Sequence, residues 1–475
     1  MIYRDFFEVV PPGGFLIVAA WMTIFGVEFG STRVLAVGMI AVIAALSYAA
    51  ATLASGHRLL AVMLATAWAI RVPFENNHHW FTTAASMAAA VCVLLALEDS
   101  PARRAAAFAA GLFAGIAVTV TQTRGALLCV AVLAVLLTLP GARSRLVSAV
   151  AGMTVWPTAI IIYLALTGAL VKAADSLVWF TSHRYAGVQY LRFGSFATWT
   201  DVVTVAVFPV AFLLTGAAFA LKPHGAIWRD PRGRTALALA IVGLLGAFPR
   251  PDIAHLNFTV PLACPLVALV APYVIGRLPR PARIAVSALM IGLCILAVAY
   301  ATKRRMDVIT EPLETISTPR GATVRRAAPW TADFALLMAY LDRVPAGDPV
   351  FFYPYLPMLP YLTGRPHVAA LDVMVPGYTT PEQFRATCAR VVHDARWLVV
   401  DRTWSDPRKL HSLFPAMADH NPPEKRAFEG AVAQAFDKVV HRSSTFEVRQ
   451  RGTAVADTLC PGTAARGHAA PVGHQ

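Results

Sequence analysis

Residues 75–124 read ENNHHWFTTAASMAAAVCVLLALEDSPARRAAAFAAGLFAGIAVTVTQTR, and this stretch decides the fold. Two apolar segments are joined by a turn that contains Arg103 and Arg104, while their far ends carry the polar strings 75–79 and 122–124. A helix needs roughly 17–25 mostly apolar residues to cross a bilayer, and both segments approach that length. Helices joined by a short turn run in opposite directions, so the arginine pair and the polar strings are predicted on opposite sides of a membrane.

The same alternation extends along the whole apolar part of the chain. One set of turns is cationic: Arg103 and Arg104; Arg143 and Arg145; Lys222, Arg229, Arg232 and Arg234; and Arg277, Arg280 and Arg283. The other set mixes acids, histidines and arginines, at 3–8, 75–79, 122–124, 172–192 and 250–255. Cationic turns stay on the cytoplasmic side, so the mixed set is predicted to gather on the outer face. The basic string 303–305, at the outer end of the last helix, is an exception to this rule.

The composition excludes an ordinary soluble protein. Hydrophobic residues make up 57% of the chain, charged residues 14%, and the mean hydropathy is +0.57, whereas globular domains carry about 25% charged residues. The net charge of +14 is explained by cytoplasmic arginines and a basic tail facing anionic membrane lipid. The sequence contains no nucleic-acid-binding module, so nucleic acid is not expected as a partner.

We therefore expect an α-helical polytopic membrane protein with a C-terminal extracytoplasmic α/β domain. Spanning helices are predicted at 34–54, 58–74, 80–97, 105–121, 126–140, 146–168, 199–221, 235–249, 258–276 and 284–301. The segment 14–28 is marginal for a span, with an interfacial or re-entrant position as the alternative. The aromatic-rich loop 169–198 suits a segment that lies on the membrane surface.

The predicted units follow from these segments. They are an outer loop with a juxtamembrane segment at 1–33, a transmembrane domain of about ten helices at 34–303, an extracytoplasmic α/β domain at 304–460 and a disordered tail at 461–475. Within the third unit, buried strands are predicted at 349–353 and 397–401, and helices near 329–343, 381–394 and 423–436. Cys388 and Cys460 are able to pair if this unit is extracytoplasmic, but their spacing alone leaves the pairing open.

Acidic residues in the first loop are candidates for catalysis. Asp5 and Glu8 precede a Pro11-Pro12-Gly13-Gly14 break that stops any helix. The functional interpretation is a carboxylate held at the membrane surface beside a polar cavity, acting as a general base toward an acceptor hydroxyl. The alternative is a solvated loop that leads into a helix.

The other mixed loops supply imidazoles and guanidinium groups. Asp252 and His255 are further catalytic candidates, and the candidates for binding a carrier phosphate or substrate are Arg71, His78, His79, Arg124, Arg184 and Arg250. Arginine gives bidentate hydrogen bonds to phosphate, although an arginine near a helix end also snorkels to lipid headgroups. Adjacent histidines lack the usual spacing of metal ligands, so hydrogen bonding is the favoured role and a divalent metal the alternative.

With these residues in view, the sequence resembles the polytopic GT-C glycosyltransferases, in the bacterial protein-mannosyltransferase and aminoarabinose-transferase branch. The resemblance rests on the string Tyr3-Arg4-Asp5-Phe6-Phe7-Glu8 before Pro11-Pro12, on the loop 250–256 followed by Pro261, and on the strings 347–351 and 397–401. In that family a membrane helix and an Asp-Glu pair precede the Tyr-Arg-Asp string, and that acidic residue is taken as catalytic. This chain starts beyond that point, so we expect either a longer natural protein or a degenerate copy.

The resemblance implies transfer of a sugar from a polyprenyl-phosphate carrier to an acceptor on the outer face of the bacterial inner membrane. The acceptor, whether glycan, lipid or protein, is not implied, and no cofactor is certain. Two alternatives remain from the residues: a multi-pass transporter or flippase, and a non-catalytic membrane assembly protein of cell-envelope glycan synthesis. A transporter is expected to carry ionisable residues near its helix centres, whereas here they lie at the ends.

Overall fold

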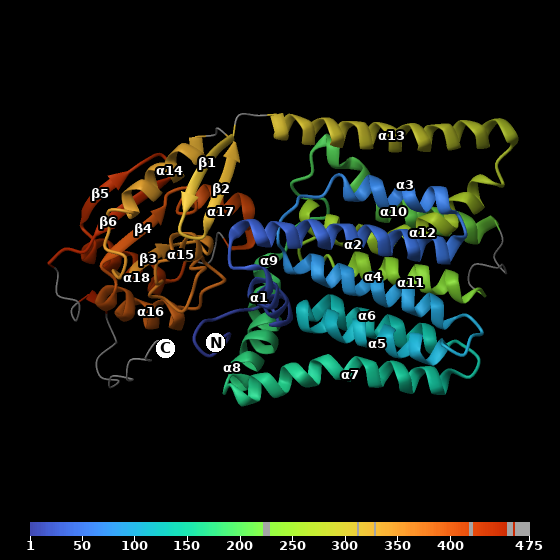
Figure 1. Ribbon diagram of the computed structural model, residues 1–475, viewed down its shortest axis with the longest axis horizontal. Coiled ribbons are helices and arrows are strands. Elements are labelled where there is room, and N and C mark those ends of the chain that lie inside the picture. The colour runs from blue at the N-terminus through green and yellow to red at the C-terminus, as the bar shows by residue number, and fades with distance from the viewer. Residues whose placement is uncertain (222–228, 311–312, 327–328, 418–420, 454–458, 461–475) are drawn as a thin grey trace.

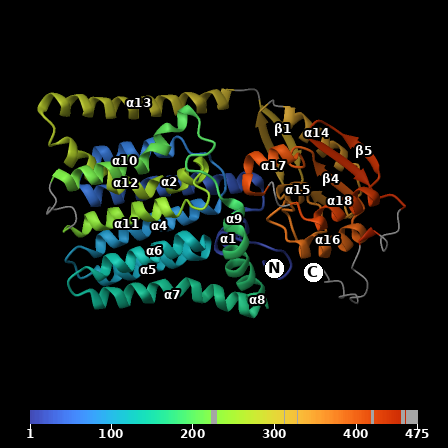
Figure 2. The same cartoon turned by 180° about the vertical axis from the view of Figure 1, so that it is seen from behind.

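The computed structural model describes residues 1–221, 229–310, 313–326, 329–417, 421–453 and 459–460. A bundle of roughly parallel and antiparallel helices occupies one half of the molecule, and a mixed α/β unit occupies the other (Figures 1 and 2). The predicted tail at 461–475 and the predicted cytoplasmic Lys222 lie outside the described residues.

The ten predicted apolar segments are all helices. They are α2 (Phe29–Ser55), α3 (Arg58–Ala69), α4 (His78–Ala96), α5 (Arg103–Val120), α6 (Gln122–Leu137), α7 (Ala142–Leu166), α10 (Val202–Leu221), α11 (Pro231–Leu245), α12 (Ile253–Ile275) and α13 (Arg280–Thr310). Among the described residues, seven helices are long and apolar enough to cross a membrane: α2, α4, α5, α7, α10, α12 and α13. The chain is a multi-pass membrane protein.

Polar side chains cap several helices at their first turns. Asn77 accepts a hydrogen bond from the backbone of His79 at 3.0 Å, and Asp252 accepts one from the backbone of His255 at 3.0 Å. Asp230 caps α11 in the same way. A cap satisfies backbone N–H groups that a helix leaves unpaired, so it sets where each helix begins and where the neighbouring polar side chains lie.

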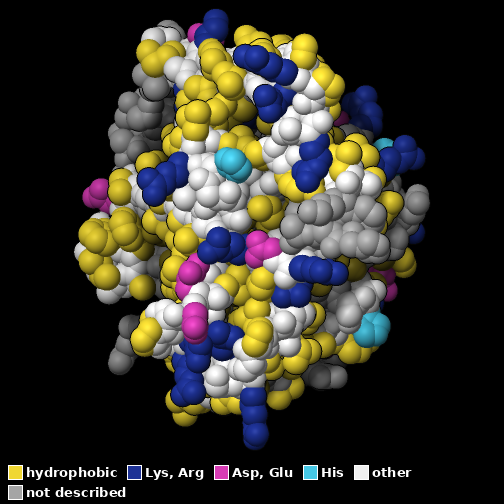
Figure 3. Space-filling view, turned by 90° about the vertical axis from the view of Figure 1, so that its right-hand side faces the viewer, with side chains coloured by type: hydrophobic (Ala, Val, Ile, Leu, Met, Phe, Trp, Pro, Cys, Tyr) yellow, Lys and Arg dark blue, Asp and Glu magenta, His cyan; other side chains and the backbone are white. Residues whose placement is uncertain are grey.

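The two sets of turns lie at opposite ends of the bundle, as predicted. Arg232 at the start of α11 pairs with Glu98 beyond the end of α4 at 2.7 Å, which joins two turns of the cationic set. This end faces the viewer in Figure 3, where Lys and Arg side chains are scattered over it. The mixed turns lie at the other end, beside the α/β unit (Figure 1).

The exception to the charge rule has a local explanation. Arg305 lies at the α/β end of α13, where its Nε donates to the carbonyl of Ile70 at 2.8 Å and its guanidinium lies 3.8 Å from the ring of Phe74. A cation held by carbonyls and an aromatic face loses less on leaving water than an isolated one. The basic string 303–305 is therefore partly engaged by the α3–α4 turn.

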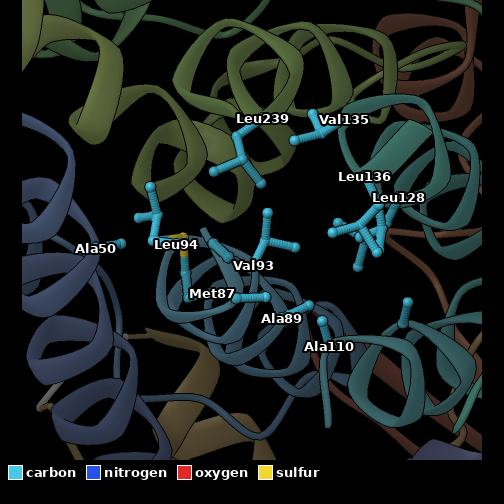
Figure 4. Packing of buried hydrophobic residues seen from close by; sticks show 14 of the residues in the cluster. Ala50, Met87, Ala89, Val93, Leu94, Ala110, Leu128, Val135, Leu136 and Leu239 are labelled. Carbon is cyan, nitrogen blue, oxygen red and sulfur yellow. The ribbon is translucent and has the colours of Figure 1, made fainter. Parts of the chain in front are cut away.

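Helix α4 is the central element of the bundle. Its side chains Met87, Val93 and Leu94 are almost fully buried and face α2, α6 and α11 (Figure 4). Small residues allow closer contact still: a Cβ on Gly111 of α5 would overlap the carbonyl of Ala149 in α7. In a membrane, helix association depends on such close packing because lipid is as apolar as leucine.

Two helical segments lie across the end of the bundle that faces the α/β unit. The first is α1 (Gly13–Phe25), which is too short to span. The second, here named the interfacial run after its predicted position, is made of α8 (Leu170–Ala174), the π-helix η1 (Asp175–Tyr185) and α9 (Ala186–Gln189), and it crosses the bundle axis (Figure 1). Val171, Val178 and Trp179 on this run are exposed, which suits the predicted position at the membrane surface.

The C-terminal unit contains a four-stranded mixed sheet in the order β3-β4-β6-β5, formed by β3 (Val350–Tyr353), β4 (Trp397–Asp401), β5 (Lys438–Arg442) and β6 (Phe446–Gln450). Strands β3 and β4 are parallel and the other pairs are antiparallel. The predicted strands correspond to β3 and β4, and the predicted helices to α14 (Pro329–Leu341), α16 (Pro381–Asp394) and α18 (Pro423–Ala435). The hairpin β1 (Leu313–Thr318) and β2 (Gly321–Arg326), the short helices α15 (Met358–Thr363), α17 (Pro407–Leu413) and η3 (Pro415–Met417), and strands β5 and β6 were not predicted.

Cysteine pairing resolves an alternative that the sequence leaves open. Cys388 in α16 and Cys460 form a disulfide across a separation of 72 residues. Both cysteines belong to a core that includes Phe384 and Phe428, so the bond fastens the end of the described chain to the domain.

The contact between α5 and α7 gives a test of the bundle. Gly111→Val should lower the free energy of unfolding by about 1–3 kcal/mol, because the new side chain has no space against Ala149. Thermal unfolding of the detergent-solubilised protein measures the change. Gly216→Val is the matched control, since a Cβ there meets no atom within 4 Å; equal melting temperatures for the two variants would contradict this packing.

Candidate active site

A carboxylate links an arginine and a histidine at the start of α12. Asp252 Oδ2 accepts from Arg250 Nε at 2.8 Å, and Asp252 Oδ1 lies 2.7 Å from His255 Nδ1. The Arg250 and Asp252 side chains are only 13% and 6% exposed. Because Asp252 also caps α12, the start of the helix fixes this network in space.

The environment of Asp252 favours its ionised form. Burial raises the pKa of this carboxyl, but hydrogen bonding and charge from His255, together with the hydrogen bond from Arg250, outweigh burial and lower the pKa overall. Asp252 is therefore a carboxylate at neutral pH. An imidazole that is hydrogen-bonded through Nδ1 to a carboxylate presents its other ring nitrogen to a substrate.

The two histidines of the α3–α4 turn lie beside this network. The rings of His79 and His255 are 5.1 Å apart, and those of His78 and His79 are 4.1 Å apart. His79 also stacks on Phe258 at 4.7 Å. Within the part of the chain that the structure describes, no group of three or more His, Cys, Asp or Glu side chains is arranged to hold a metal ion.

Arg124 points into the protein instead of snorkelling to lipid. It is fully buried, and its terminal nitrogens make long hydrogen bonds, at 3.3 Å to Thr83 Oγ1 and at 3.4 Å to the carbonyl of Gly246. Its Nε has no hydrogen-bond partner among the described residues. The positively charged guanidinium group therefore lies against α4, one helical turn beyond His79.

Glu8 is held in the N-terminal loop against the α/β unit. The backbone N–H of Phe7 donates to the carbonyl of Ala370 at 2.9 Å. Glu8 Oε1 accepts from the N–H groups of Val9 and Val10 at 2.7 and 3.0 Å. The pKa of Glu8 is raised to about 7, mainly by burial and also by the negative charge of Asp372, against the lowering effect of these hydrogen bonds.

The start of α6 connects Glu8 with the rest of the bundle. Gln122 Nε2 approaches the carbonyl oxygens of Val9 and Leu177 at 3.5 and 3.4 Å. The loop that carries Glu8, the interfacial run and the α5–α6 turn therefore meet at one place. A carboxyl group with a pKa near neutrality is suited to accept and return a proton.

Two sequence candidates do not join this arrangement. Asp5 is exposed and pairs with Arg4 at 2.8 Å and with the amino group of Met1 at 2.7 Å. Arg184 on η1 is exposed, and its charge acts on Glu382 of the α/β unit. The structure thus places Asp5 and Arg184 apart from the other candidates: both are exposed, and neither has a described contact with Asp252, His255 or Arg124.

A cavity of about 670 Å³ lies between the first turn of α12, the α3–α4 turn and the end of α13. Its polar lining consists of Arg71, Glu75, Thr200, Asp201, Asn257, Tyr300, Arg304 and Arg305. Trp80, Ala254 and Phe258 also line it, and they neighbour His79 and His255. Arg71 was a sequence candidate, whereas Arg304 and Arg305 were not, although their violation of the charge rule is a sequence signal that distinguishes them.

An apolar groove continues from this cavity along the bundle. Ile70 and Phe74 line both the cavity and a hollow of about 490 Å³ between α2 and α3. Val62 and Thr66 of α3 then connect that hollow with one of about 350 Å³ against α13. Helix α13 runs apart from the main bundle beside α3 (Figure 1), so the groove lies where lipid surrounds the protein.

The helix bundle with an α/β unit at one end is a fold that solved membrane proteins share. The chain is similar to ArnT from Cupriavidus metallidurans, whose crystal structure contains bound undecaprenyl phosphate: the TM-score is 0.52 at 15% identity, over 94% of this chain and 88% of ArnT. It also aligns with the arabinofuranosyltransferase AftD from Mycobacteria, with a TM-score of 0.47 at 13% identity, over 87% of this chain and 33% of AftD. No protein-family model and no curated protein matches the sequence. The similarity to ArnT confirms the expected GT-C fold.

The raised pKa of Glu8 predicts an unusual pH dependence of stability. The folded state favours the protonated carboxyl, so this contribution to stability is present below pH 4.5 and is lost as the pH rises through about 7. Glu8→Gln should therefore melt at a higher temperature than the unaltered protein above pH 7, with little difference below pH 4.5. Asp5→Asn, at an exposed carboxylate of the same loop, should show no such gain; the same pH profile for both variants would contradict the burial of Glu8.

Proposed function

We propose that this chain is a membrane glycosyltransferase that moves a sugar from a polyprenyl-phosphate carrier to an extracytoplasmic acceptor. The proposal is supported by three features that lie together at one end of the bundle: a cationic cavity, an apolar groove and a cluster of polar side chains. A cationic cavity opens into an apolar groove, and the carboxylate, imidazole and guanidinium cluster lies beside that cavity. A lipid-linked sugar phosphate has the matching parts: a long apolar chain, an anionic head and a sugar.

The cavity suits the anionic head of the carrier. It contains three arginines, Arg71, Arg304 and Arg305, and two carboxylates, so positive charge is in excess. Arg71 is partly occupied, because it donates to the carbonyl of Thr200 at 2.6 Å and lies 3.3 Å from Asp201. Arginines bind phosphate strongly where water is partly excluded. ArnT, which shares the fold, binds undecaprenyl phosphate, and we extend that ligand class to this chain.

The cluster suits the transfer step. The acceptor hydroxyl oxygen attacks the anomeric carbon, the bond from that carbon to the phosphate oxygen breaks, and the carrier leaves as a phosphate. Glu8 takes the hydroxyl proton as general base. Arg124 and the cavity arginines stabilise the negative charge that develops on the phosphate. Asp252 acts through His255 and Arg250, whose positions it holds.

The distribution of charge disfavours transport as the function. A transporter binds its cargo near the bilayer midplane through ionisable or discontinuous helix segments. Here the ionisable groups of the cluster occur at helix starts, as with His78 in α4 and Asp252 before α12. Chemistry at the membrane boundary accounts for this placement better than passage through the membrane.

Sidedness supports an acceptor outside the cytoplasm. The turns at the far end are cationic, as cytoplasmic turns are, and the Cys388–Cys460 disulfide fits an oxidising compartment. We therefore assign the α/β unit to the extracytoplasmic side of a bacterial inner membrane.

Carrier binding tests the first half of the proposal. Arg304→Gln should weaken the binding of undecaprenyl phosphate to the full chain in nanodiscs by about tenfold, the loss of one charge-assisted contact. Arg283→Gln is the matched control, because Arg283 lies on the same helix α13 at its opposite end. Equal affinity in both variants, or no binding by the unaltered protein, would remove the carrier from this cavity.

Transfer of radiolabelled sugar from synthetic polyprenyl-phosphate sugars tests the second half. Asp252→Asn keeps a helix cap but loses the ion pair with Arg250, and should reduce transfer by about a hundredfold or more. Arg124→Gln should act in the same direction. Asp230→Asn removes the charge from an equivalent cap at the other end of the bundle and should leave transfer unchanged. Full activity in both site variants would refute this assignment of roles.

A further inference from the structure

The α/β unit places a second carboxylate beside Glu8. The hydrogen bond from Phe7 to Ala370 brings the 370–373 segment against the N-terminal loop, and the charge of Asp372 acts on Glu8. The Asp372 side chain is open to solvent, although protein around it raises its own pKa. Among the described residues, no cation forms an ion pair with Asp372. Two neighbouring carboxylates repel each other, so a hydrogen-bond donor from outside the chain would relieve this arrangement.

Aromatic side chains of the same unit surround the carboxylates. Burial raises the pKa of the Tyr355 hydroxyl, and the negative charges of Asp372 and Glu8 both act on this group in the same direction. The Tyr355 ring lies 4.5 Å from that of Trp404. Trp404 is followed by Phe414 at 6.4 Å, and both rings are half-buried. The row Tyr355, Trp404 and Phe414 thus runs from the carboxylates toward the bundle.

Arg250 closes the other end of this aromatic row. Its guanidinium lies 4.5 Å from the ring of Phe414, and its terminal nitrogens donate to the Leu413 carbonyl at 3.1 Å and to Gln189 Oε1 at 3.2 Å. Gln189 in turn donates to the hydroxyl of Tyr378. The aromatic row is therefore continuous with the network that contains Asp252 and His255.

We propose that Asp372, Tyr355 and Trp404 form the acceptor subsite and that this subsite binds a carbohydrate ring. Sugar rings combine apolar C–H faces, which pack on aromatic rings, with hydroxyl groups, which donate to carboxylates. A ring stacked on Tyr355 and Trp404 with a hydroxyl on Asp372 would bring an adjacent hydroxyl toward Glu8. The inference rests on the proposed function, and it adds that the α/β unit selects the acceptor.

Packing between the two halves accounts in part for Tyr355 and Phe414, which pack against Val188 and Val375, but it does not account for Asp372 or Trp404. The contact of the interfacial run with the α/β unit is made by apolar residues such as Val188 and Val375, both almost fully buried. Asp372 adds no apolar contact to it. Its replacement by asparagine therefore removes charge with little change in volume, so a binding role is separable from a structural one.

The experiment uses the full chain in nanodiscs and a panel of free sugars, glucose, mannose, galactose and arabinose, with binding followed by saturation-transfer NMR. At least one sugar should bind the unaltered protein, and Asp372→Asn should weaken that binding by about tenfold. Asp394→Asn, at an exposed carboxylate on α16 of the same unit, should bind as the unaltered protein does. Trp404→Leu should also weaken binding, and it provides a second variant at a half-exposed loop position.

Two results would overturn the subsite: no sugar binding by the unaltered protein, or equal sugar affinity in the Asp372 and Asp394 variants with an unchanged Trp404 variant. Undecaprenyl phosphate binding is measured in the same samples. Loss of sugar binding in Asp372→Asn with retained lipid binding supports the inference. Absence of lipid binding in the unaltered protein would reject the carrier proposal, while the sugar comparison would still decide the subsite.

Discussion

The ion pair between Arg250 and Asp252 is the interaction that joins the parts of this molecule. Asp252 caps α12 and holds His255, so the bundle sets the position of the carboxylate. Arg250 extends from that carboxylate to Gln189 of the interfacial run and to the Leu413 carbonyl of the α/β unit. Both side chains are largely buried. Removing either partner would leave an uncompensated charge in a poorly solvated place, which costs more than the pair contributes.

The membrane makes this junction the natural place for chemistry. Helices that cross lipid satisfy their backbone hydrogen bonds internally, and their facing surfaces in α5 and α7 are reduced to small residues such as Gly111 and Ala149. Such surfaces have little room for polar groups. Charged and imidazole side chains therefore collect at the helix ends, where the α/β unit and the interfacial run shield them from bulk water. Among the candidate site residues that the structure describes, Arg124 has a guanidinium group that is fully buried within the bundle.

Within the candidate site, a local signal in the sequence anticipates one contact: Asp252 and His255 are three residues apart at a helix start, and the structure joins them. The sequence does not distinguish Asp5 from Glu8, which are equally acidic and lie in the same loop. Their difference comes from their surroundings: the Asp5 carboxylate is exposed and pairs with Arg4, whereas the charge of Asp372, more than three hundred residues later in the chain, acts on Glu8. Nothing in the local sequence around Asp5 or Glu8 predicts this interaction with Asp372.

By itself, the sequence determined the helices and which turns share an end of the bundle, because hydropathy and the placement of charged residues are local properties of each segment. It also indicated strands β3 and β4, whose apolar runs are buried in the sheet. The tertiary structure alone decided which polar groups meet. Arg304 joins Arg71 because α13 packs beside α3, and Asp372 joins Glu8 because one backbone hydrogen bond docks the first loop on the last domain. Such contacts depend on how distant elements pack, and composition and periodicity carry no record of that packing.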